Sequence, residues 1–510
     1  MATADIGIMG SGVMGSNLAL NIADKTGSDG QNFCVALFDL VPSQVEQVLA
    51  DNSSYSNLLG FKGAEALQDF VQALKKPRKI IMLVPAGKPT DDAIAQVSAL
   101  LETGDILIDV GNANFRDQIR RAAELEARGL RFLNMGVSGG AEGARKGPAF
   151  FPGGTVSIWE DIREIVEAAA AKAEDGRPCV TMNGNSGAGS CVKMFHNAGE
   201  YAVLQIWGEV FEIMKAYGVP AEEQKKLLME WKTKRGGRFD GLLDSYMLDI
   251  TIEVVAVQDS PEAGGVADGT LLIDRCMDKT DSKGTGLWSV VEALNAGEPA
   301  PSLIAAVLAR QMSMQRPQRL QNASRFPLPA PPQSAAGKWT AEMAESLFWT
   351  AAMSIIASYA QMFQCLRKMD EIFKFGMNLP KTIATFRAGC ILQGFLLQPM
   401  TEAFEVDPAC NLITAFSEEL SLGLPKCKAL LGQVTTETSA TIPCMYASLD
   451  YIQTMLCTEI PSAQCVSLQR DVFGRHGYER LGADGRFYAS WRPMHPGGAK
   501  VSSAKSGPAL

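Results

Sequence analysis

The stretch Ile6-Gly7-Ile8-Met9-Gly10-Ser11-Gly12-Val13-Met14-Gly15 decides the fold of the N-terminal region. Four residues typical of a buried strand lead into a G-x-G-x-x-G turn, and a helical pattern follows over residues 17–23. In this order, glycines let the backbone approach a pyrophosphate at the N-terminus of the helix. A glycine-rich turn without a ligand is the alternative, but the flanking elements favour a dinucleotide site. Its residues are Gly10, Ser11, Gly12, Val13, Met14 and Gly15.

Short apolar runs and helical patterns alternate after this turn. Further strands are expected at 35–38, 80–84, 106–110 and 132–135, with a helix at 117–127 among the segments between them. This alternation predicts a parallel sheet with helices on both faces, which is an α/β Rossmann domain.

From about Gly187 onward, long helical patterns replace the strands. They cover residues 191–217, 221–232, 303–313 and 341–369, and a proline-rich loop over 325–332 interrupts them. We therefore expect a Rossmann domain at 1–186, a large all-α domain at 187–458 and a C-terminal tail at 459–510 that turns irregular after Tyr488.

Composition excludes several classes of protein. The net charge of −9 argues against a nucleic-acid partner, and the three scattered His give no metal-ligand spacing. The 11 Cys, odd in number and without a C-x-x-C pair, indicate reduced thiols. Residues 346–366 carry no charge and are long enough to span a bilayer, but their Ser and Gln content favours a buried core helix over a membrane segment. With no leader before the first strand, a cytoplasmic protein is expected.

A polar stripe runs along the first long helix of the all-α region. Helical spacing places five side chains on one face, and each can donate or accept a proton or hydrogen bond: Lys193, His196, Asn197, Glu200 and Tyr201. The remaining positions are apolar or small, so the helix is suited to burial. A solvated polar stripe is the commoner interpretation of such a pattern, but a buried stripe must face partners or a ligand.

Other polar groups lie where strands end, at the edge of a parallel sheet that binds ligands. Asp39 follows the second strand, where a carboxylate accepts from the ribose hydroxyls of NAD or merely caps a turn. Asn112 and the run Val137-Ser138-Gly139-Gly140 follow later strands, and each is equally consistent with a plain turn. The run Lys283-Gly284-Thr285-Gly286 reads as a loop whose amides suit a phosphate, although such loops are more often solvated.

Together these segments resemble the decarboxylating 6-phosphogluconate dehydrogenases of the pentose phosphate pathway. The resemblance runs nearly end to end. It rests on the glycine turn, the Lys-x-x-His-Asn-x-x-Glu-Tyr helix, and a C-terminal element with Gln469-Arg470-Asp471 and His476.

The resemblance implies a role for each site residue. Lys193 would remove the proton from the substrate 3-hydroxyl as hydride leaves C3, and Glu200 would protonate C1 of the enediol formed by loss of CO2. The substrate contacts it implies are Asn112, Ser138, Gly139, Gly140, His196, Asn197, Tyr201, Lys283, Thr285 and Arg310, with Arg470 and His476 donated across a homodimer. The implied partners are 6-phosphogluconate and a second copy of the chain, with no membrane and no nucleic acid.

Departures from the family pattern concern the dinucleotide. The usual Asn-Arg-Thr after the second strand is Asp39-Leu40-Val41, and the usual lysine of the Val84-Pro85-Ala86-Gly87 turn is Pro85, although Arg78, Lys79 or Lys88 could fold toward this site. Both changes remove positive charge from the expected position of a 2′-phosphate, so NAD is favoured and NADP, the family default, is the alternative. Val84 and Asn112 complete the expected cofactor contacts.

Two rival functions stay open from the sequence alone. The first is a dehydrogenase of another β-hydroxy acid, such as 3-hydroxyisobutyrate, and the second is a dinucleotide sensor without activity. Lys283, Arg310, Arg470 and His476 argue against the first, and the intact Lys193 and Glu200 argue against the second.

Overall fold

The computed structural model describes residues 3–282, 284–326 and 335–491. Contacts within the chain group residues 1–452 into one compact unit and residues 453–510 into a second. The finer division at 186/187 and 458/459 stays a prediction.

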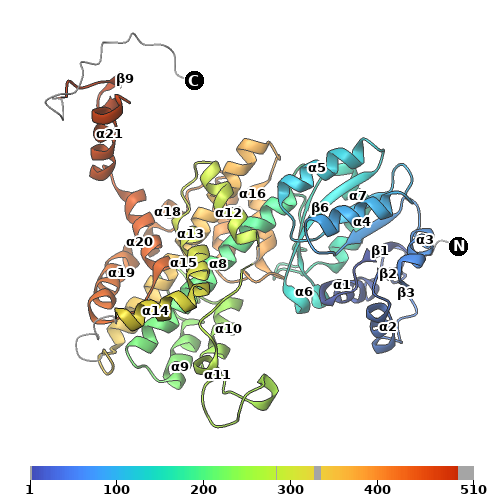
Figure 1. The fold of residues 1–510 in the computed structure, drawn as a ribbon, viewed down its shortest axis with the longest axis horizontal. Coiled ribbons are helices and arrows are strands. Elements are labelled where there is room, and N and C mark those ends of the chain that lie inside the picture. The colour runs from blue at the N-terminus through green and yellow to red at the C-terminus, as the bar shows by residue number, and fades with distance from the viewer. Residues whose placement is uncertain (1–2, 283, 327–334, 492–510) are drawn as a thin grey trace. The chain divides into compact units, whose positions relative to one another are not determined.

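A seven-stranded sheet organises the N-terminal region in the order β3-β2-β1-β4-β5-β6-β7 (Figure 1). Its strands are β1 (Ile6–Met9), β2 (Val35–Asp39), β3 (Leu58–Lys62), β4 (Lys79–Met82), β5 (Ile106–Asp109), β6 (Arg131–Ser138) and β7 (Ala149–Gly153). The first six are parallel, whereas β7 pairs antiparallel with β6. The expected parallel sheet is therefore confirmed for its main part. Two strands were missed: β3, which is only partly buried, and β7, which contains Pro152 and Gly153.

Helices cover both faces of this sheet, as expected. They are α1 (Val13–Ala23), α2 (Pro42–Asp51), α3 (Leu67–Gln72), α4 (Lys88–Ser98), α5 (Phe115–Glu126), α6 (Gly140–Lys146) and α7 (Val156–Ala169). Apolar residues of α1 and α7 pack with Ile6 and Ile8 on one face, and those of α3, α4 and α5 pack with Met9 and Met82 on the other. Because both faces are buried, the central strands are apolar throughout.

The helical region follows within the same unit. Its longer helices are α8 (Ala188–Ala216), α9 (Ala221–Trp231), α10 (Tyr246–Val254), α12 (Gly284–Asn295), α13 (Pro301–Met314), α14 (Arg316–Arg325), α15 (Ala341–Phe373), α17 (Leu397–Val406), α19 (Ser417–Glu437) and α20 (Pro443–Leu456). Short helices α11 (Leu272–Arg275), α16 (Leu379–Ala384) and α18 (Leu412–Ala415) complete it. The second unit contains α21 (Pro461–Gly474) and the hairpin β8 (Tyr478–Arg480) and β9 (Ala483–Phe487), which the sequence did not predict.

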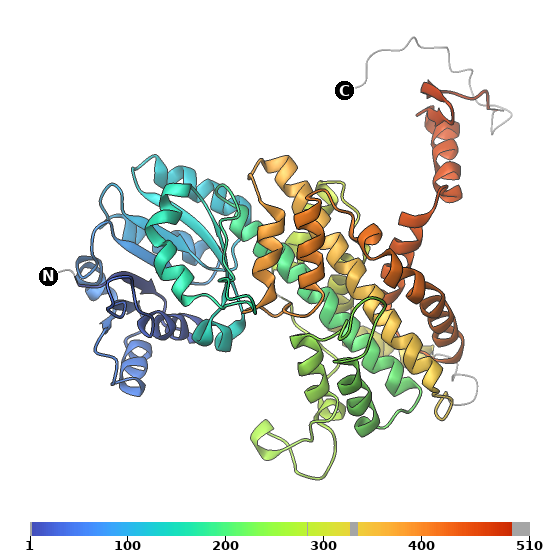
Figure 2. The same ribbon diagram turned by 180° about the vertical axis from the view of Figure 1, so that it is seen from behind.

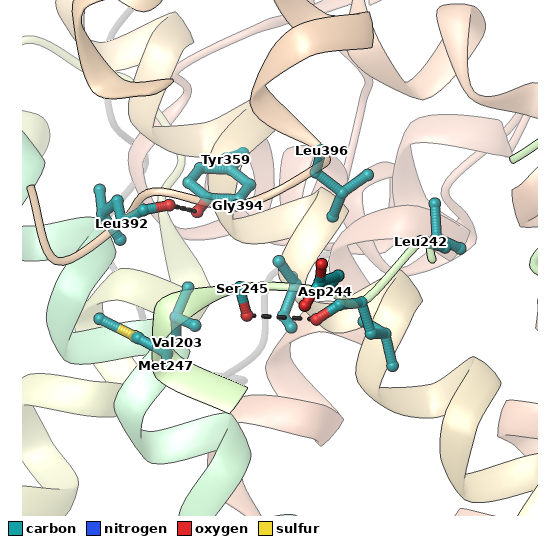
Figure 3. A pocket seen from close by; sticks show the side chains of 11 residues that line it. Val203, Leu242, Asp244, Ser245, Met247, Tyr359, Leu392, Gly394 and Leu396 are labelled. Atoms are coloured by element: carbon teal, nitrogen blue, oxygen red, sulfur yellow. Dashed lines mark hydrogen bonds between the residues drawn. The ribbon is translucent and has the colours of Figure 1, made fainter. Parts of the chain in front are cut away.

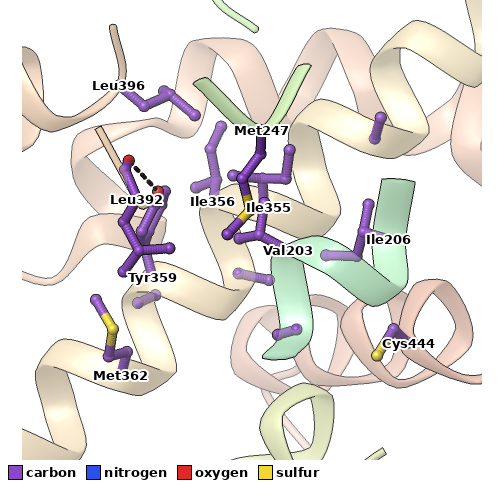
Figure 4. Close-up of a cluster of buried hydrophobic side chains, with 14 of the residues drawn as sticks. Val203, Ile206, Met247, Ile355, Ile356, Tyr359, Met362, Leu392, Leu396 and Cys444 are labelled. Carbon is purple, nitrogen blue, oxygen red and sulfur yellow. Dashed lines mark hydrogen bonds between the residues drawn. The ribbon is translucent and has the colours of Figure 1, made fainter. Parts of the chain in front are cut away.

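Helices α8 and α15 lie side by side at the centre of the helical region (Figures 1 and 2). Figure 4 shows Val203 and Ile206 of α8 packed with Ile355 and Tyr359 of α15. The segment proposed as a membrane candidate is therefore a core helix, as expected. None of the described helices is long and apolar enough to cross a membrane.

Helix α8 also packs closely against the sheet. A Cβ on Gly136 of β6 would lie 2.5 Å from the Cβ of Lys193, and a Cβ on Gly189 would collide with the Phe151 carbonyl oxygen of β7. These two glycines let the first half of α8 approach the ends of β6 and β7, which places the polar stripe beside the sheet.

Candidate active site

The glycine turn after β1 has the geometry that a bound dinucleotide needs. Gly10 has φ +105°, and a Cβ there would collide with the Leu83 carbonyl oxygen at the end of β4. A Cβ on Gly15 would collide with the Gly10 carbonyl oxygen, whereas Gly12 is exposed with nothing within 4 Å. Gly12 is the N-cap of α1 and has no side-chain cap, so the first amides of this helix are available to a pyrophosphate.

Asp39 at the end of β2 is fixed by hydrogen bonds to this turn. Its Oδ2 accepts from the amide of Ser11 at 2.7 Å and the hydroxyl of Ser11 at 3.0 Å, and its Oδ1 accepts from the amide of Val41 at 2.9 Å. Asp39 therefore caps the turn before Pro42, which was one interpretation of this residue. It also lies beside the glycine turn, which the alternative role as a ribose ligand requires.

The cations considered as alternative phosphate ligands are held elsewhere. Arg78 is buried and bonds Asp105 and Glu102. It immediately precedes β4 and Lys79 is the first residue of β4, so both lie at the amino ends of the parallel strands, whereas Asp39 lies at the carboxyl end of β2. Lys88 pairs with Asp92, one turn along α4. Lys62, in register with Asp39, pairs with Glu46.

A chain of hydrogen bonds joins the end of β6 to α8 and α12. The Ser138 hydroxyl lies 3.3 Å from His196 Nε2, and His196 Nδ1 lies 3.4 Å from Asn197 Oδ1. Asn197 Nδ2 in turn donates to the hydroxyl of Thr285 at 3.3 Å. All four residues are buried.

His196 lies between two aromatic rings that the sequence analysis did not identify. The ring centroids of Phe151 and Phe386 lie 5.7 Å and 5.1 Å from that of His196. Burial, with a further contribution from the nearby Lys193, holds the pKa of His196 well below its usual value. A neutral imidazole can orient a ligand by hydrogen bonding but brings no charge to the site.

The two candidate proton-transfer residues occupy the same face of α8. Lys193 is 8% exposed and lies against β6, whereas Glu200 is partly exposed. They are seven residues apart, which corresponds to about 10 Å along a helix axis. The predicted stripe is therefore one continuous surface of a helix that is otherwise buried.

Tyr201, Thr285 and Arg310 meet at the far end of this stripe. The Arg310 guanidinium lies over the Tyr201 ring, 3.5 Å from its centroid. A Cβ on Gly286 would lie 2.8 Å from Tyr201 Cε1, so α12 packs directly against this ring. Gly284, Thr285 and Gly286 form the first turn of α12 rather than the expected loop, because this packing overrides the low helix propensity of glycine. Lys283 lies outside the described residues.

Gly139, Gly140 and Asn112 are turn residues that follow β6 and β5. Gly139 has φ +112°, and a Cβ there would lie 2.7 Å from the Gly389 carbonyl oxygen. Gly140 has φ +62° and opens α6, and Asn112 is exposed after β5. Only glycine combines the backbone conformation and the close approach that residue 139 requires.

Arg470 and His476 belong to the second unit and are exposed there. Between them, Asp471 is buried, and its carboxylate accepts from the amides of Gly477 and Ala489 and from the indole N–H of Trp491. These donors lower the pKa of Asp471. Asp471 thus ties the β8–β9 hairpin to α21.

The small cavity drawn in Figure 3 is not this site. It has a volume of about 20 Å³, and apolar side chains such as Val203, Met247 and Leu392 line much of it. That space admits little more than one water molecule. Among the described residues, no cluster of His, Cys, Asp or Glu could hold a metal ion, and all 11 Cys are free thiols.

Comparisons with known proteins agree with this geometry. The model of the 6-phosphogluconate dehydrogenase C-terminal domain matches residues 189–491, and that of the NAD binding domain of 6-phosphogluconate dehydrogenase matches residues 5–184. The chain is 52% identical over 491 residues to the decarboxylating 6-phosphogluconate dehydrogenase of Trypanosoma brucei brucei, covering 96% of this chain and 98% of that one. It is 35% identical over 494 residues to the Escherichia coli K12 enzyme of the same name, covering 96% and 100%.

A solved structure shares the fold across both regions. The 6-phosphogluconate dehydrogenase of Plasmodium falciparum, described in its apo form, with its cofactor NADP⁺ and with its substrate 6-phosphogluconate, matches with a TM-score of 0.86. The identity is 30%, and the match covers 96% of this chain and 100% of that one. The chain therefore belongs to the 6-phosphogluconate dehydrogenase family of decarboxylating oxidoreductases, and its N-terminal region binds a nicotinamide dinucleotide.

Proposed function

We propose that this chain oxidises and decarboxylates 6-phospho-D-gluconate to D-ribulose 5-phosphate and CO₂. The observation that carries the proposal is the hydrogen-bond chain Ser138–His196–Asn197–Thr285, which joins two chemically different ends of the α8 stripe. Turn amides and a hydroxyl at the Ser138 end suit a carboxylate, and Thr285 with Arg310 at the other end suits a phosphate. From Lys193 to Tyr201 the stripe spans about 12 Å, long enough for an extended six-carbon acid with a terminal phosphate.

Lys193 is the proposed base. When bound, the dinucleotide accepts the hydride from C3, and Lys193 takes the proton of the 3-hydroxyl. A neutral amine is needed for this step, and burial against β6 disfavours the ammonium form of Lys193. The products of the step are a 3-keto acid and a protonated Lys193.

Decarboxylation and protonation then use both Lys193 and Glu200. As the bond to the carboxyl carbon breaks and CO₂ leaves, the bonding electrons form an enediol, and Lys193 returns its proton to the 3-oxygen. Glu200 in its protonated state donates to C1 of the enediol, which gives the ketose. This chemistry requires one base and one acid, and Lys193 and Glu200 are the proposed pair.

The remaining residues bind and orient the substrate. Ser138, Gly139 and Gly140 would contact the carboxylate and hydroxyl groups, while Asn112, His196 and Asn197 would orient substrate and nicotinamide. Tyr201, Lys283, Thr285 and Arg310 would hold the phosphate. Arg470 and His476, exposed on α21 and just after it, would reach the site of a second copy in a homodimer.

We further infer that NAD is preferred to NADP. Asp39 lies beside the glycine turn, where its carboxylate can accept from ribose hydroxyls but repels a 2′-phosphate. Leu40 and Val41 bring no charge, and Arg78 and Lys79 lie at the amino end of β4, away from the carboxyl ends of the strands.

One assay tests the substrate. Purified enzyme is given 6-phosphogluconate or 3-hydroxyisobutyrate with each dinucleotide. Both the reduced dinucleotide and the CO₂ released from substrate labelled at its carboxyl carbon are measured. We expect equimolar dinucleotide reduction and CO₂ release with 6-phosphogluconate alone. Reduction without CO₂, or faster turnover of 3-hydroxyisobutyrate, would contradict the proposal.

A further inference from the structure

Arg121 of α5 is almost fully buried, although it lies on an amphipathic helix at the edge of the dinucleotide-binding region. Its side chain is 1% exposed, whereas that of the neighbouring Arg120 is 44% exposed. A buried guanidinium has five donors to satisfy, so its partners indicate what it holds in place.

Three partners of Arg121 lie on three different segments. Nε donates to Asp91 in the first turn of α4 at 2.8 Å, and Nη2 donates to the Gly87 carbonyl oxygen at 3.1 Å. Nη1 donates to Asp109, the last residue of β5, at 3.3 Å. The guanidinium therefore joins the loop after β4 to the end of β5.

Asp109 extends this network to the next loop. Its Oδ2 also accepts from the Gln118 side chain at 2.7 Å, and its Oδ1 accepts from the Gly111 amide at 2.9 Å. A Cβ on Gly111 would lie 3.3 Å from the Val84 carbonyl oxygen, so the two loops are also in close contact. Asp109 has no exposed surface, and its carboxylate depends on these donors.

Both loops lie where the sheet binds its dinucleotide. The strand order reverses between β1 and β4, and ligands of open α/β sheets bind at the carboxyl ends of the strands at that point. The loop after β4, residues 84–87, adjoins the glycine turn, because a Cβ on Gly10 would meet the Leu83 carbonyl oxygen. Pro85 and Ala86 of this loop are exposed, while Arg121 holds it from behind.

We propose that Arg121 is a positioning residue for the dinucleotide, acting by fixing the loops 84–87 and 110–112 against each other. It does not touch the ligand. A preformed loop loses less conformational entropy on binding than a free one, so this network raises the affinity for the dinucleotide. The inference concerns dinucleotide binding alone and does not depend on the substrate proposed above.

The experiment compares Arg121→Met with Arg120→Met. Both variants remove one positive charge from the same helix, and both arginines bond Asp91, but only Arg121 reaches Gly87 and Asp109. NADH and NADPH are each titrated into the substrate-free enzyme, with binding followed by nucleotide fluorescence at a temperature well below the Tm of each variant. We expect the Kd of the preferred nucleotide to rise about tenfold in Arg121→Met and to stay within about twofold in Arg120→Met.

Further variants separate positioning from stability. Arg121→Lys keeps a charge and part of the hydrogen bonding, and should recover part of the affinity. If Arg121→Met does not fold, Arg121→Lys decides, because a single ammonium cannot reproduce the three-way geometry in which the guanidinium bonds Asp91, Gly87 and Asp109. A wild-type Kd in folded Arg121→Lys would then overturn the proposal, and a several-fold weaker one would support it. Equal Kd values for folded Arg121→Met and wild type, or an equal loss in Arg120→Met, would also overturn it.

Discussion

Helices α8 and α21 both carry predicted site residues, yet their surroundings are opposite. Most of the 29 residues of α8 are buried, including Lys193, His196 and Asn197. Of the 14 residues of α21, only Asp471 is buried, and apolar side chains such as Val466 and Phe473 are 51% and 70% exposed. The chain itself thus orients the site residues of α8, whereas Arg470 is exposed among the described residues. This difference is what the proposal expects if α8 carries the chemistry and α21 contributes to the site of a second copy.

The largest effect is expected from the buried lysine of the α8 stripe. Lys193→Met should lower turnover by about 10²–10⁴-fold, because the base acts only on the substrate, and it should leave dinucleotide affinity within about twofold. Lys215→Met on the same helix is the matched control, since Lys215 is exposed and pairs with Asp274. Steady-state kinetics and nucleotide titration measure both quantities. Turnover close to wild type in Lys193→Met would refute the proposed mechanism.

Glu200→Gln should lower steady-state turnover by about 10²-fold, because it slows the protonation of the enediol. Protonation of C1 follows hydride transfer and loss of CO₂, so the first turnover should still reduce the dinucleotide. Rapid mixing of enzyme, dinucleotide and 6-phosphogluconate should show a burst of reduced dinucleotide in Glu200→Gln and none in Lys193→Met. Absence of the burst from both variants would place Glu200 before or at hydride transfer.

Removing the hairpin tests whether α21 acts through a second copy of the chain. Truncation before Gly477 deletes β8 and β9 and the three donors that Asp471 accepts from, the amides of Gly477 and Ala489 and the indole N–H of Trp491. We expect the truncated chain to shift from dimer to monomer in light scattering at assay concentration and to lose most activity. A truncated monomer with full activity would show that Arg470 and His476, which the truncated chain keeps, do not act through a second copy.

Arg470→Ala should raise the KM for 6-phosphogluconate about tenfold with a smaller change in kcat, because a cation that binds the substrate phosphate contributes on the order of 1–2 kcal/mol. Arg480→Ala in the hairpin is the control, since Arg480 is also exposed and lies over the Phe487 ring of the same hairpin. A lower kcat at unchanged KM in Arg470→Ala would indicate that Arg470 acts in the chemical step instead.

Short-range patterns predicted much of this molecule. The strand at Ile6–Met9 and the stripe on α8 follow from residues adjacent in sequence or one helical turn apart, and both are present as expected. The strand at Ala149–Gly153 was missed because Pro152 and Gly153 read as punctuation, whereas an edge position tolerates both. Arg121 gave no local signal, because its burial depends on Asp109 and Gly87, which are 12 and 34 residues away. Residues 284–286 were read as a loop because only their contact with Tyr201 makes them helical.

The smallest predicted effect concerns the choice of dinucleotide. It depends on Asp39, which, like the site residues of α8, is oriented by contacts within its own chain. Asp39 is positioned by its own chain through Ser11 and Val41, so its carboxylate is present whether or not a ligand binds. A 2′-phosphate beside it meets like charge worth on the order of 1 kcal/mol at a partly screened site, which corresponds to a preference for NAD of roughly tenfold in kcat/KM. Asp39→Asn removes the charge but keeps an oxygen that can accept from Ser11, so it should narrow the gap several-fold, mainly by improving NADP. Steady-state kinetics with both dinucleotides measure this ratio of kcat/KM values.

A preference for NADP in the wild type would mean that a cation such as Lys62, which is in register with Asp39, leaves Glu46 to bind the phosphate. Lys62→Met would then remove that preference.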